Sequence, residues 1–179
     1  MVMAKSTTKS QLATRVAFLR IAFGVMWAID AVFKWQPTFM NSFMDMINSA
    51  AQGQPAWLAP WFTAWHHLLA INPKFFAVSV AVIESLIAIA LLFGVAKRAT
   101  YLLAIVFSLC IWTVAEGFGG PYTASSTDIG AAVMYAVVFF ALYGLEQLAG
   151  ESKLSLDEPL KRRFSWWHFL ADPGRPSGN

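Results

Sequence analysis

The stretch FFAVSVAVIESLIAIALLFGVA, which runs from Phe75 to Ala96, decides the fold class of this chain. It contains one ionisable residue, Glu84, and is otherwise almost wholly apolar. About 20 such residues, wound as an α-helix, cross the hydrocarbon core of a bilayer. A strand exposed to lipid would leave backbone groups without hydrogen bonds, so only a helix suits this environment. The stretch therefore predicts a transmembrane helix.

Three further apolar runs accompany this one. The predicted spans cover about residues 16–34, 75–96, 99–116 and 128–148. Hydrophobic residues make up 58% of the chain and charged residues 13%, and a charged share this far below the roughly 25% of soluble domains is typical of membrane proteins. We therefore expect an all-α integral membrane protein. Its four-helix bundle comprises residues 1–150 and leaves no room for a separate soluble domain.

The connection from Trp35 to Lys74 is too long for a simple turn. Its first part carries apolar residues at helical spacing, and after Gly53-Gln54-Pro55 three tryptophans recur at every fourth position. These tryptophans are Trp57, Trp61 and Trp65. Tryptophan prefers the headgroup level of a bilayer. We therefore expect two short interfacial helices that form an extracytoplasmic cap between helices one and two.

The basic residues predict the orientation of the spans. Most of them lie in the N-terminal segment, in the Lys97-Arg98 turn or in the C-terminal tail, whereas Lys34 and Lys74 alone lie on the other side. Because basic loops stay in the cytoplasm, both termini are expected there, in a multi-pass protein of the inner (plasma) membrane. This distribution suits lipid headgroups and argues against nucleic acid as a partner. The single cysteine, Cys110, excludes an intrachain disulfide.

Residues 151–179 are expected to form a cytoplasmic amphipathic tail. Within them the segment KRRFSWWHF joins three cations to four aromatic residues. They are Lys161, Arg162, Arg163, Phe164, Trp166, Trp167 and Phe169. This composition is typical of an anchor to the anionic lipid of the inner leaflet.

Each predicted span contributes one acid to the outer half of the bundle. The four acids are Asp30, Glu84, Glu116 and Asp128. Ionisable groups in a span are costly, so each is a candidate functional residue. Helical spacing turns Glu84 inward on a face of small residues and stacks Glu116 with Trp112. With Trp27 and Tyr135, these acids are expected to line a small outward-facing pocket.

Structural roles compete with this interpretation at three of the acids. Asp30 and Lys34 have the i,i+4 spacing of a helix-surface ion pair. Asp128 precedes a helix start, as an N-cap or first-turn residue does. Glu116 borders a Gly-rich turn, where a solvated acid is ordinary. Glu84 alone has no water to solvate it, which favours a functional or network role.

Two further groups are expected to be structural. Arg20 and Glu146 fall at similar depths on the cytoplasmic half, where a structural pair or simple snorkelling explains both. On the outer face, methionine sulfur and histidine imidazole groups are ligands that copper prefers, so a copper site is an alternative to a structural role. They belong to Met40, Met44, Met46, His66 and His67. Because Met40 and Met44 also fit an amphipathic stripe, and adjacent histidines cannot face one way on a regular helix, no metal site is predicted.

Three segments carry a family resemblance. They are LRIAFGVMWAIDAVFKWQP (19–37), the run from Glu84 to Arg98, and WTVAEGFGGPYTASSTDIG (112–130). Together they resemble the DoxX/DoxD-like family of four-helix membrane proteins, which includes the membrane subunit of a thiosulfate:quinone oxidoreductase. The resemblance covers most of the four-helix region. It does not extend to the tail.

The resemblance implies a quinone-linked oxidoreductase or respiratory electron-transfer role. The positions that match the family's recurrent polar and aromatic pattern are Asp30, Lys34, Trp35, Glu84, Trp112, Glu116, Tyr122 and Asp128. In such a subunit the candidate catalytic acids, which would handle quinone protons, are Glu84, Asp30, Glu116 and Asp128. The candidate quinone contacts are Trp27, Lys34, Trp112 and Tyr122. The sequence itself requires no cofactor and leaves open whether the chain is an enzyme.

Two other functions stay open at this point. A non-catalytic accessory or assembly subunit of a larger membrane complex would dock through small-residue faces such as Ala77 and Ala81. Replacing Glu84 by Gln would then leave activity intact. A small transporter or proton path built on the acids is the third function. Four spans without detectable repeats or broken helices argue against it, because alternating-access transporters are commonly built from such repeats.

Overall fold

The computed structural model describes residues 2–124, 126, 128–149 and 154–172, with the backbone alone for residues 2–8. Within these residues the chain is helical and contains no strand. Four helices are long and apolar enough to cross a membrane, as predicted. They are α1 (Val2–Lys34), α4 (Pro73–Phe93), α5 (Lys97–Val114) and α6 (Ala131–Ala149). Residues 150–153 and 173–179 of the predicted tail lie outside the described residues.

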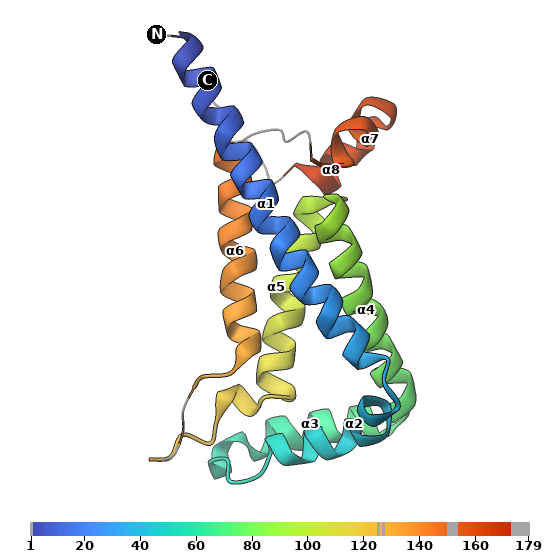
Figure 1. Cartoon of the computed structure of the whole chain (residues 1–179). Coiled ribbons are helices and arrows are strands. Elements are labelled where there is room, and N and C mark those ends of the chain that lie inside the picture. Colours follow the sequence, from blue (N-terminus) through green and yellow to red (C-terminus); the bar gives the residue numbers. More distant parts are fainter. Residues whose placement is uncertain (1, 125, 127, 150–153, 173–179) are drawn as a thin grey trace.

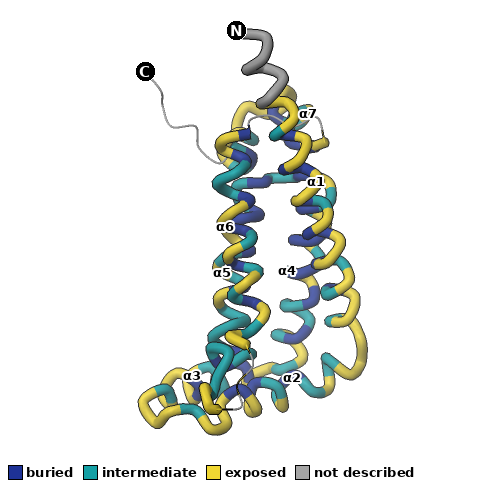
Figure 2. Tube along the Cα trace, turned by 60° about the vertical axis from the view of Figure 1, so that its left-hand side comes forward, coloured by how far each residue is buried: buried dark blue, intermediate teal, exposed yellow. Residues whose placement is uncertain are grey.

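The four long helices pack as two antiparallel pairs, α1 with α4 and α5 with α6, as Figure 1 shows. Burial follows these contacts, because dark-blue residues line the inner faces of both pairs in Figure 2. Gly24 brings α1 close to α4. A Cβ atom added there would lie 3.0 Å from the Cβ of Leu91 and 3.1 Å from the backbone nitrogen of Leu92. The first pair is therefore held closer than any larger residue at this position allows.

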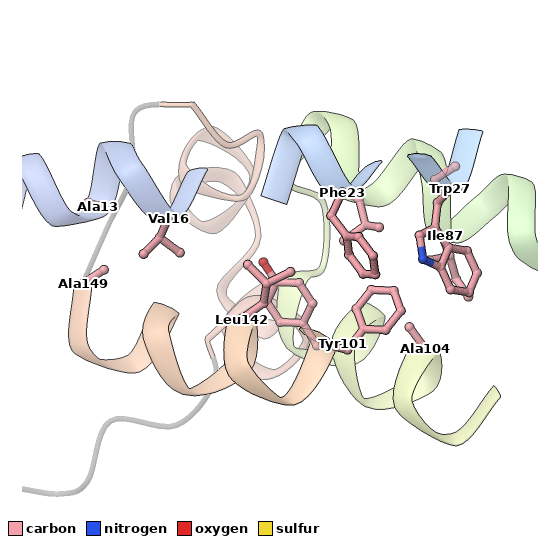
Figure 3. Packing of buried hydrophobic residues seen from close by; sticks show 12 residues of the cluster. Ala13, Val16, Phe23, Trp27, Ile87, Tyr101, Ala104, Leu142 and Ala149 are labelled. Atoms are coloured by element: carbon pink, nitrogen blue, oxygen red, sulfur yellow. The ribbon is translucent and has the colours of Figure 1, made fainter. Parts of the chain in front are cut away.

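Aromatic side chains join the two pairs at the middle of the bundle. Phe23 and Trp27 of α1 point away from their own helix toward α6, as Figure 3 shows. Their ring centroids lie 4.9 and 5.2 Å from that of Phe139. Tyr135 completes the group, with its ring centroid 5.7 Å from that of Phe23 and 5.9 Å from that of Trp27. Edge-to-face packing of this kind adds to the apolar contact area.

Two shorter helices lie across one end of the spans, which we name the cap end (Figure 1). They are α2 (Pro37–Ala50) and α3 (Ala59–Ala70), with the 3-10 turn η1 (Ala56–Leu58) between them. Two short helices were expected in this connection. Phe43 and Ile47 of α2 and Leu69 of α3 pack against Ala77 of α4 and Val114 of α5. The cap therefore covers the ends of one helix from each pair.

The connection from α5 to α6 is fastened to this cap. It begins with the 3-10 turn η2 (Gly117–Gly119). The side-chain amide of Gln54 donates hydrogen bonds to the carbonyl oxygens of Ala50, at 3.0 Å, and Gly117, at 2.8 Å. Gly117 has a φ of 55°, and a Cβ there would press on the Ala50 carbonyl. Only glycine suits this point, where two loops cross.

The C-terminal segment docks on the opposite end of the spans, which we name the tail end. It contains α7 (Asp157–Arg163), η3 (Ser165–Trp167) and α8 (His168–Ala171). Asp157 is fully buried. Its carboxylate accepts hydrogen bonds from the backbone nitrogens of Ala96, at 2.6 Å, and Lys97, at 3.1 Å, and from the Trp167 indole, at 2.8 Å. It thus caps the start of α5, a role that the sequence did not suggest.

Arg20 and Glu146 do not form a pair, which was one of the two structural explanations offered for them. Arg20 is buried, and its guanidinium donates to the carbonyl oxygens of Leu91 and Leu154. Glu146 pairs instead with Lys97, whose Nζ lies 3.0 Å from Oε2. Arg20 thus binds carbonyl groups that have no partner within the helix where α4 ends, while Lys97 neutralises the buried Glu146.

Two helix boundaries differ from the predicted ones by three residues, and α1 begins earlier, at Val2 rather than near residue 16. α4 ends at Phe93, because Gly94 has a φ of 64° and turns the chain in the left-handed conformation. α6 begins at Ala131. Asp128 lies three residues earlier in an extended connection, where its carboxylate accepts from the Gly130 nitrogen at 2.8 Å.

We expect Gly24→Ala to lower the stability of the bundle by about 1–3 kcal/mol, because the new methyl group overpacks the contact between α1 and α4. Gly144→Ala is the matched control, since a Cβ there meets nothing within 4 Å. The control should be neutral or slightly stabilising. Thermal unfolding in detergent, followed by size-exclusion chromatography, compares the two variants. Equal melting temperatures would contradict the close packing of this pair.

We expect Asp157→Ala to release the tail from the tail end, because two backbone nitrogens and the Trp167 indole lose their acceptor. Loss of an N-cap alone costs about 1 kcal/mol. Trypsin cleavage after Arg162 or Arg163 should then become faster. Ser165→Ala, at an exposed position of the same segment, should cleave like the wild type. An unchanged rate for Asp157→Ala would show that its carboxylate does not hold the tail.

Candidate functional site

A lysine and two carboxylates meet between α1 and α4 toward the cap end. The Nζ atom of Lys34 lies 3.4 Å from Oδ1 of Asp30 and 3.5 Å from Oε2 of Glu84. The first contact is the i,i+4 pair expected within α1, and the second joins the two helices. We name these three residues the charged cluster. The structure therefore brings together two of the four acids predicted to share a pocket.

Glu84 is the most enclosed member of the charged cluster. Its side chain is 1% exposed, against 22% for Lys34 and 40% for Asp30. Glu84 is the twelfth residue of α4, about 16 Å along the helix axis from Pro73. Its Oε2 atom is buried and accepts no hydrogen bond within the described structure. A carboxyl group at this depth with an unfilled acceptor is costly, so a ligand or proton that completes its contacts would be favoured.

The neighbourhood of Lys34 fixes where its ammonium group lies. Trp35 donates its indole N–H to the Ser85 hydroxyl at 3.0 Å, which ties the end of α1 to α4 one residue beyond Glu84. The ammonium group also lies 5.5 Å from the ring centroid of Phe39 in α2. Lys34 thus stays between the two acids rather than extending to solvent. Ser85 was not singled out from the sequence, because a lone serine in a helix is a weak signal.

Four more buried polar atoms lack hydrogen-bond partners among the described residues, and two of these atoms lie on the inner faces of α1 and α5. These two are the indole Nε1 of Trp27 and the hydroxyl Oγ of Ser108. Trp27 is 3% exposed and Ser108 is fully buried. Trp27 belongs to the aromatic group of the bundle core, and Ser108 lies one turn from the core residue Ala104. Buried donors of this kind usually bind something, so the interior retains hydrogen-bonding capacity.

Glu116 and Trp112 bind the backbone that leads into α6. The Glu116 carboxylate accepts from the Ala132 nitrogen at 3.0 and 3.2 Å. The Trp112 indole donates to the Ile129 carbonyl at 2.7 Å. Both side chains close on Gly130, where a Cβ would lie 2.5 Å from Glu116 Oε2. Glu116 therefore caps the start of α6, the structural role proposed from the sequence for Asp128.

The other two predicted site residues in this connection are exposed. Asp128 binds the Gly130 nitrogen, as described above, and the Tyr122 hydroxyl donates to the Phe118 carbonyl at 2.6 Å. The structure thus divides the predicted residues into two groups. Asp30, Lys34 and Glu84 form the charged cluster, whereas the residues between 112 and 128 organise the loop before α6.

The methionines considered for copper pack into the cap. Met40, Met44 and Met46 are half-buried and contact the apolar cluster of α2, α3 and α4. His66 lines a cavity of about 280 Å³ between α2 and α3, and its ring centroid lies 6.0 Å from that of His67. Across the described ranges, no three His, Cys, Asp or Glu side chains converge as a metal site would need.

Comparison of the chain with protein families, with curated proteins and with solved structures found no match.

A double-mutant cycle on Lys34 and Glu84 tests the charged cluster. We expect Lys34→Met to destabilise the wild type by about 1–3 kcal/mol more than it destabilises Glu84→Gln, because it leaves a buried carboxylate without its cation. The partial exposure of Lys34 keeps the figure below that of a fully buried pair. Thermal unfolding of the four proteins in detergent gives the coupling. Additive effects would show that the two charges do not interact.

Proposed function

We propose that the chain is the membrane subunit of a quinone-linked oxidoreductase or respiratory electron-transfer complex, and that a quinone head group binds at the charged cluster. The observation that carries this proposal is Glu84, a 1% exposed carboxyl group half-way along an apolar helix, with an unfilled acceptor oxygen 3.5 Å from Lys34. Intramembrane acids of this kind commonly exchange protons with a substrate.

The donors near the charged cluster suit the chemistry of a quinone. Quinone reduction takes up two electrons and two protons, and its carbonyl oxygens accept hydrogen bonds. Lys34 provides N–H donors, and Glu84 and Asp30 provide two groups that can hold a proton. The electrons would come from a partner subunit.

The surroundings also suit an apolar ring. Trp27 and Tyr135 offer aromatic faces in the adjacent core, and the Trp27 indole is a buried donor without an acceptor. A groove of about 500 Å³, lined mainly by Phe75, Val78 and Val82, lies on the face of α4 away from Glu84 and is not part of this site.

We infer the orientation from charge. The turn between α4 and α5 and the docked tail carry the arginines, whereas Lys34 and Lys74 lie toward the cap end. Basic segments stay in the cytoplasm, so the tail end would be cytoplasmic. The cap would then lie on the outer face of the inner membrane, and the charged cluster in the outer half. The DoxX/DoxD-like resemblance of the three segments quoted above points to the same role.

The accessory-subunit alternative needs a different surface from the one first considered. Ala77 and Ala81 are fully buried within this chain, and Ala77 packs in the apolar cluster with residues of α2, α3 and α5. Changes there would disturb the fold before they disturbed a complex. In the transporter alternative, a solute or proton would have to pass the aromatic rings of Phe23, Trp27 and Phe139, which pack across the middle of the bundle.

Quinone binding in lipid nanodiscs tests the proposal. We expect short-chain ubiquinone or menaquinone to bind the wild type, and Glu84→Gln and Lys34→Gln to weaken binding by about 10- to 100-fold, the range for one hydrogen bond to a charged group. Asp45→Asn and Lys74→Gln, at exposed positions toward the cap end, are matched controls that should bind normally. Tryptophan fluorescence quenching measures the affinity.

Two results would overturn the proposal. One is a wild-type protein that binds neither quinone, alone or with its co-purified partners. The other is full affinity and full quinol turnover in Glu84→Gln, which would favour an accessory subunit.

A further inference from the structure

A second groove lies between α4 and α5 toward the tail end. Its volume is about 410 Å³, and almost all of its surface is apolar. Leu86, Ile89 and Leu103 form its rims, while Ala90 and Ala99 leave room between the helices. Both helices are exposed to lipid on this side. The groove therefore has the shape and polarity that a hydrocarbon chain requires.

The groove ends beside the first turn of α5, which carries Arg98. Val95, Ala96 and Ala99 line its last part, and Arg98 lies within the same turn. The guanidinium of Arg98 lies 5.2 Å from the ring centroid of Phe169, which belongs to the docked α8. This contact ties α8, in the segment that also carries the exposed Arg162 and Arg163, to the start of α5, one residue before Ala99 of the groove.

The acids at the tail end do not neutralise these arginines. Glu146 is paired with Lys97, and Glu158 and Asp172 are paired with Lys161. Asp157 is occupied by backbone nitrogens. No ion pair to Arg98, Arg162 or Arg163 is formed by the described acids. Among the described residues, the outward face of this end is therefore positive, because the acids there bind partners within the chain.

Docking of the tail leaves some of its aromatic residues exposed and turns another toward the protein. Trp167 turns inward to Asp157, and Lys161 is buried, so these two residues of the KRRFSWWHF segment do not face lipid. Phe164, Trp166 and Phe169 remain 40%, 60% and 73% exposed. Aromatic rings beside arginines at the end of a span are typical of the headgroup level of a bilayer.

We propose that an anionic phospholipid binds at the tail end, with an acyl chain in the groove between α4 and α5 and its headgroup against Arg98, Arg162 and Arg163. Two independent observations support this occupant. The groove selects a hydrocarbon chain, and the unpaired arginines select a negative headgroup. The site is separate from the charged cluster and does not depend on quinone binding.

Native mass spectrometry of the full-length protein tests this site. The delipidated protein is loaded with equal amounts of phosphatidylglycerol and phosphatidylcholine, and bound lipids are counted. We expect the wild type to prefer phosphatidylglycerol. The triple variant Arg98→Gln, Arg162→Gln, Arg163→Gln should lose this preference, by about fivefold for each arginine that contacts the headgroup. Arg15→Gln, at an exposed position of α1, is the charge control.

A second pair of variants tests the groove independently of charge. Ala90→Leu with Ala99→Leu should fill it and reduce the retention of both lipids, while Ala141→Leu, on the exposed face of α6, should not. Equal binding of both lipids by the wild type would overturn the proposal, and so would an unchanged preference in the triple variant. Loss of a co-purified protein from the groove variant, with its lipid count unchanged, would assign the groove to a partner helix instead.

Discussion

The free backbone groups at the ends of the membrane-spanning helices constrain the whole arrangement. A helix satisfies its own hydrogen bonds except in its first and last turns, where hydrocarbon offers no substitute for water. Here distant residues supply the missing partners. Asn72 caps the start of α4, and Arg20 takes the carbonyl groups at its end. Asp157 caps α5 and Glu116 caps α6, so the two loops and the tail are positioned by the helix ends that they serve.

The charged cluster differs from the other buried acids in the partners that its carboxylates have. Glu116 and Asp157 bind backbone nitrogens, and Glu146 binds Lys97. Each of these acids has a structural task that its contacts account for. Glu84 differs from them, because it lies far from either end of α4 and one of its oxygens accepts no hydrogen bond, although its ion pair with Lys34 joins α4 to α1. The functional proposal therefore rests on what remains after the structural needs of the helices have been met.

Hydropathy was enough to predict the four long helices and the all-helical class, because an apolar span in lipid must satisfy its own backbone hydrogen bonds and does so as a helix. It also singled out Glu84, since an acid in the middle of an apolar run is visible without any partner. The i,i+4 pair of Asp30 and Lys34 could be predicted for the same local reason.

Partners that depend on tertiary packing could not be predicted. Arg20 was matched with Glu146 by depth alone, whereas the helix rotation that brings Lys97 to Glu146 is set by packing. Asp157 lies 60 residues from the nitrogens of the turn that it caps, and nothing in its local sequence marks that role. The capping role of Glu116 was assigned to Asp128 because sequence places Asp128 nearer the helix start. The intervening loop instead brings the Glu116 carboxylate to the Ala132 nitrogen within α6, while Asp128 binds the Gly130 nitrogen before the helix.

The capping of the turn between α4 and α5 has a consequence for biosynthesis. Both helices leave the ribosome well before Leu154 and Asp157, and chains generally fold from the N-terminus as they emerge. The carbonyl groups of Phe93 and Gly94 and the nitrogens that begin α5 therefore wait for partners in the tail, which is made after all four spans. A nascent chain that has already inserted its last helix still holds an unfinished turn at the membrane surface. The turn is therefore closed only in a chain whose tail has been made.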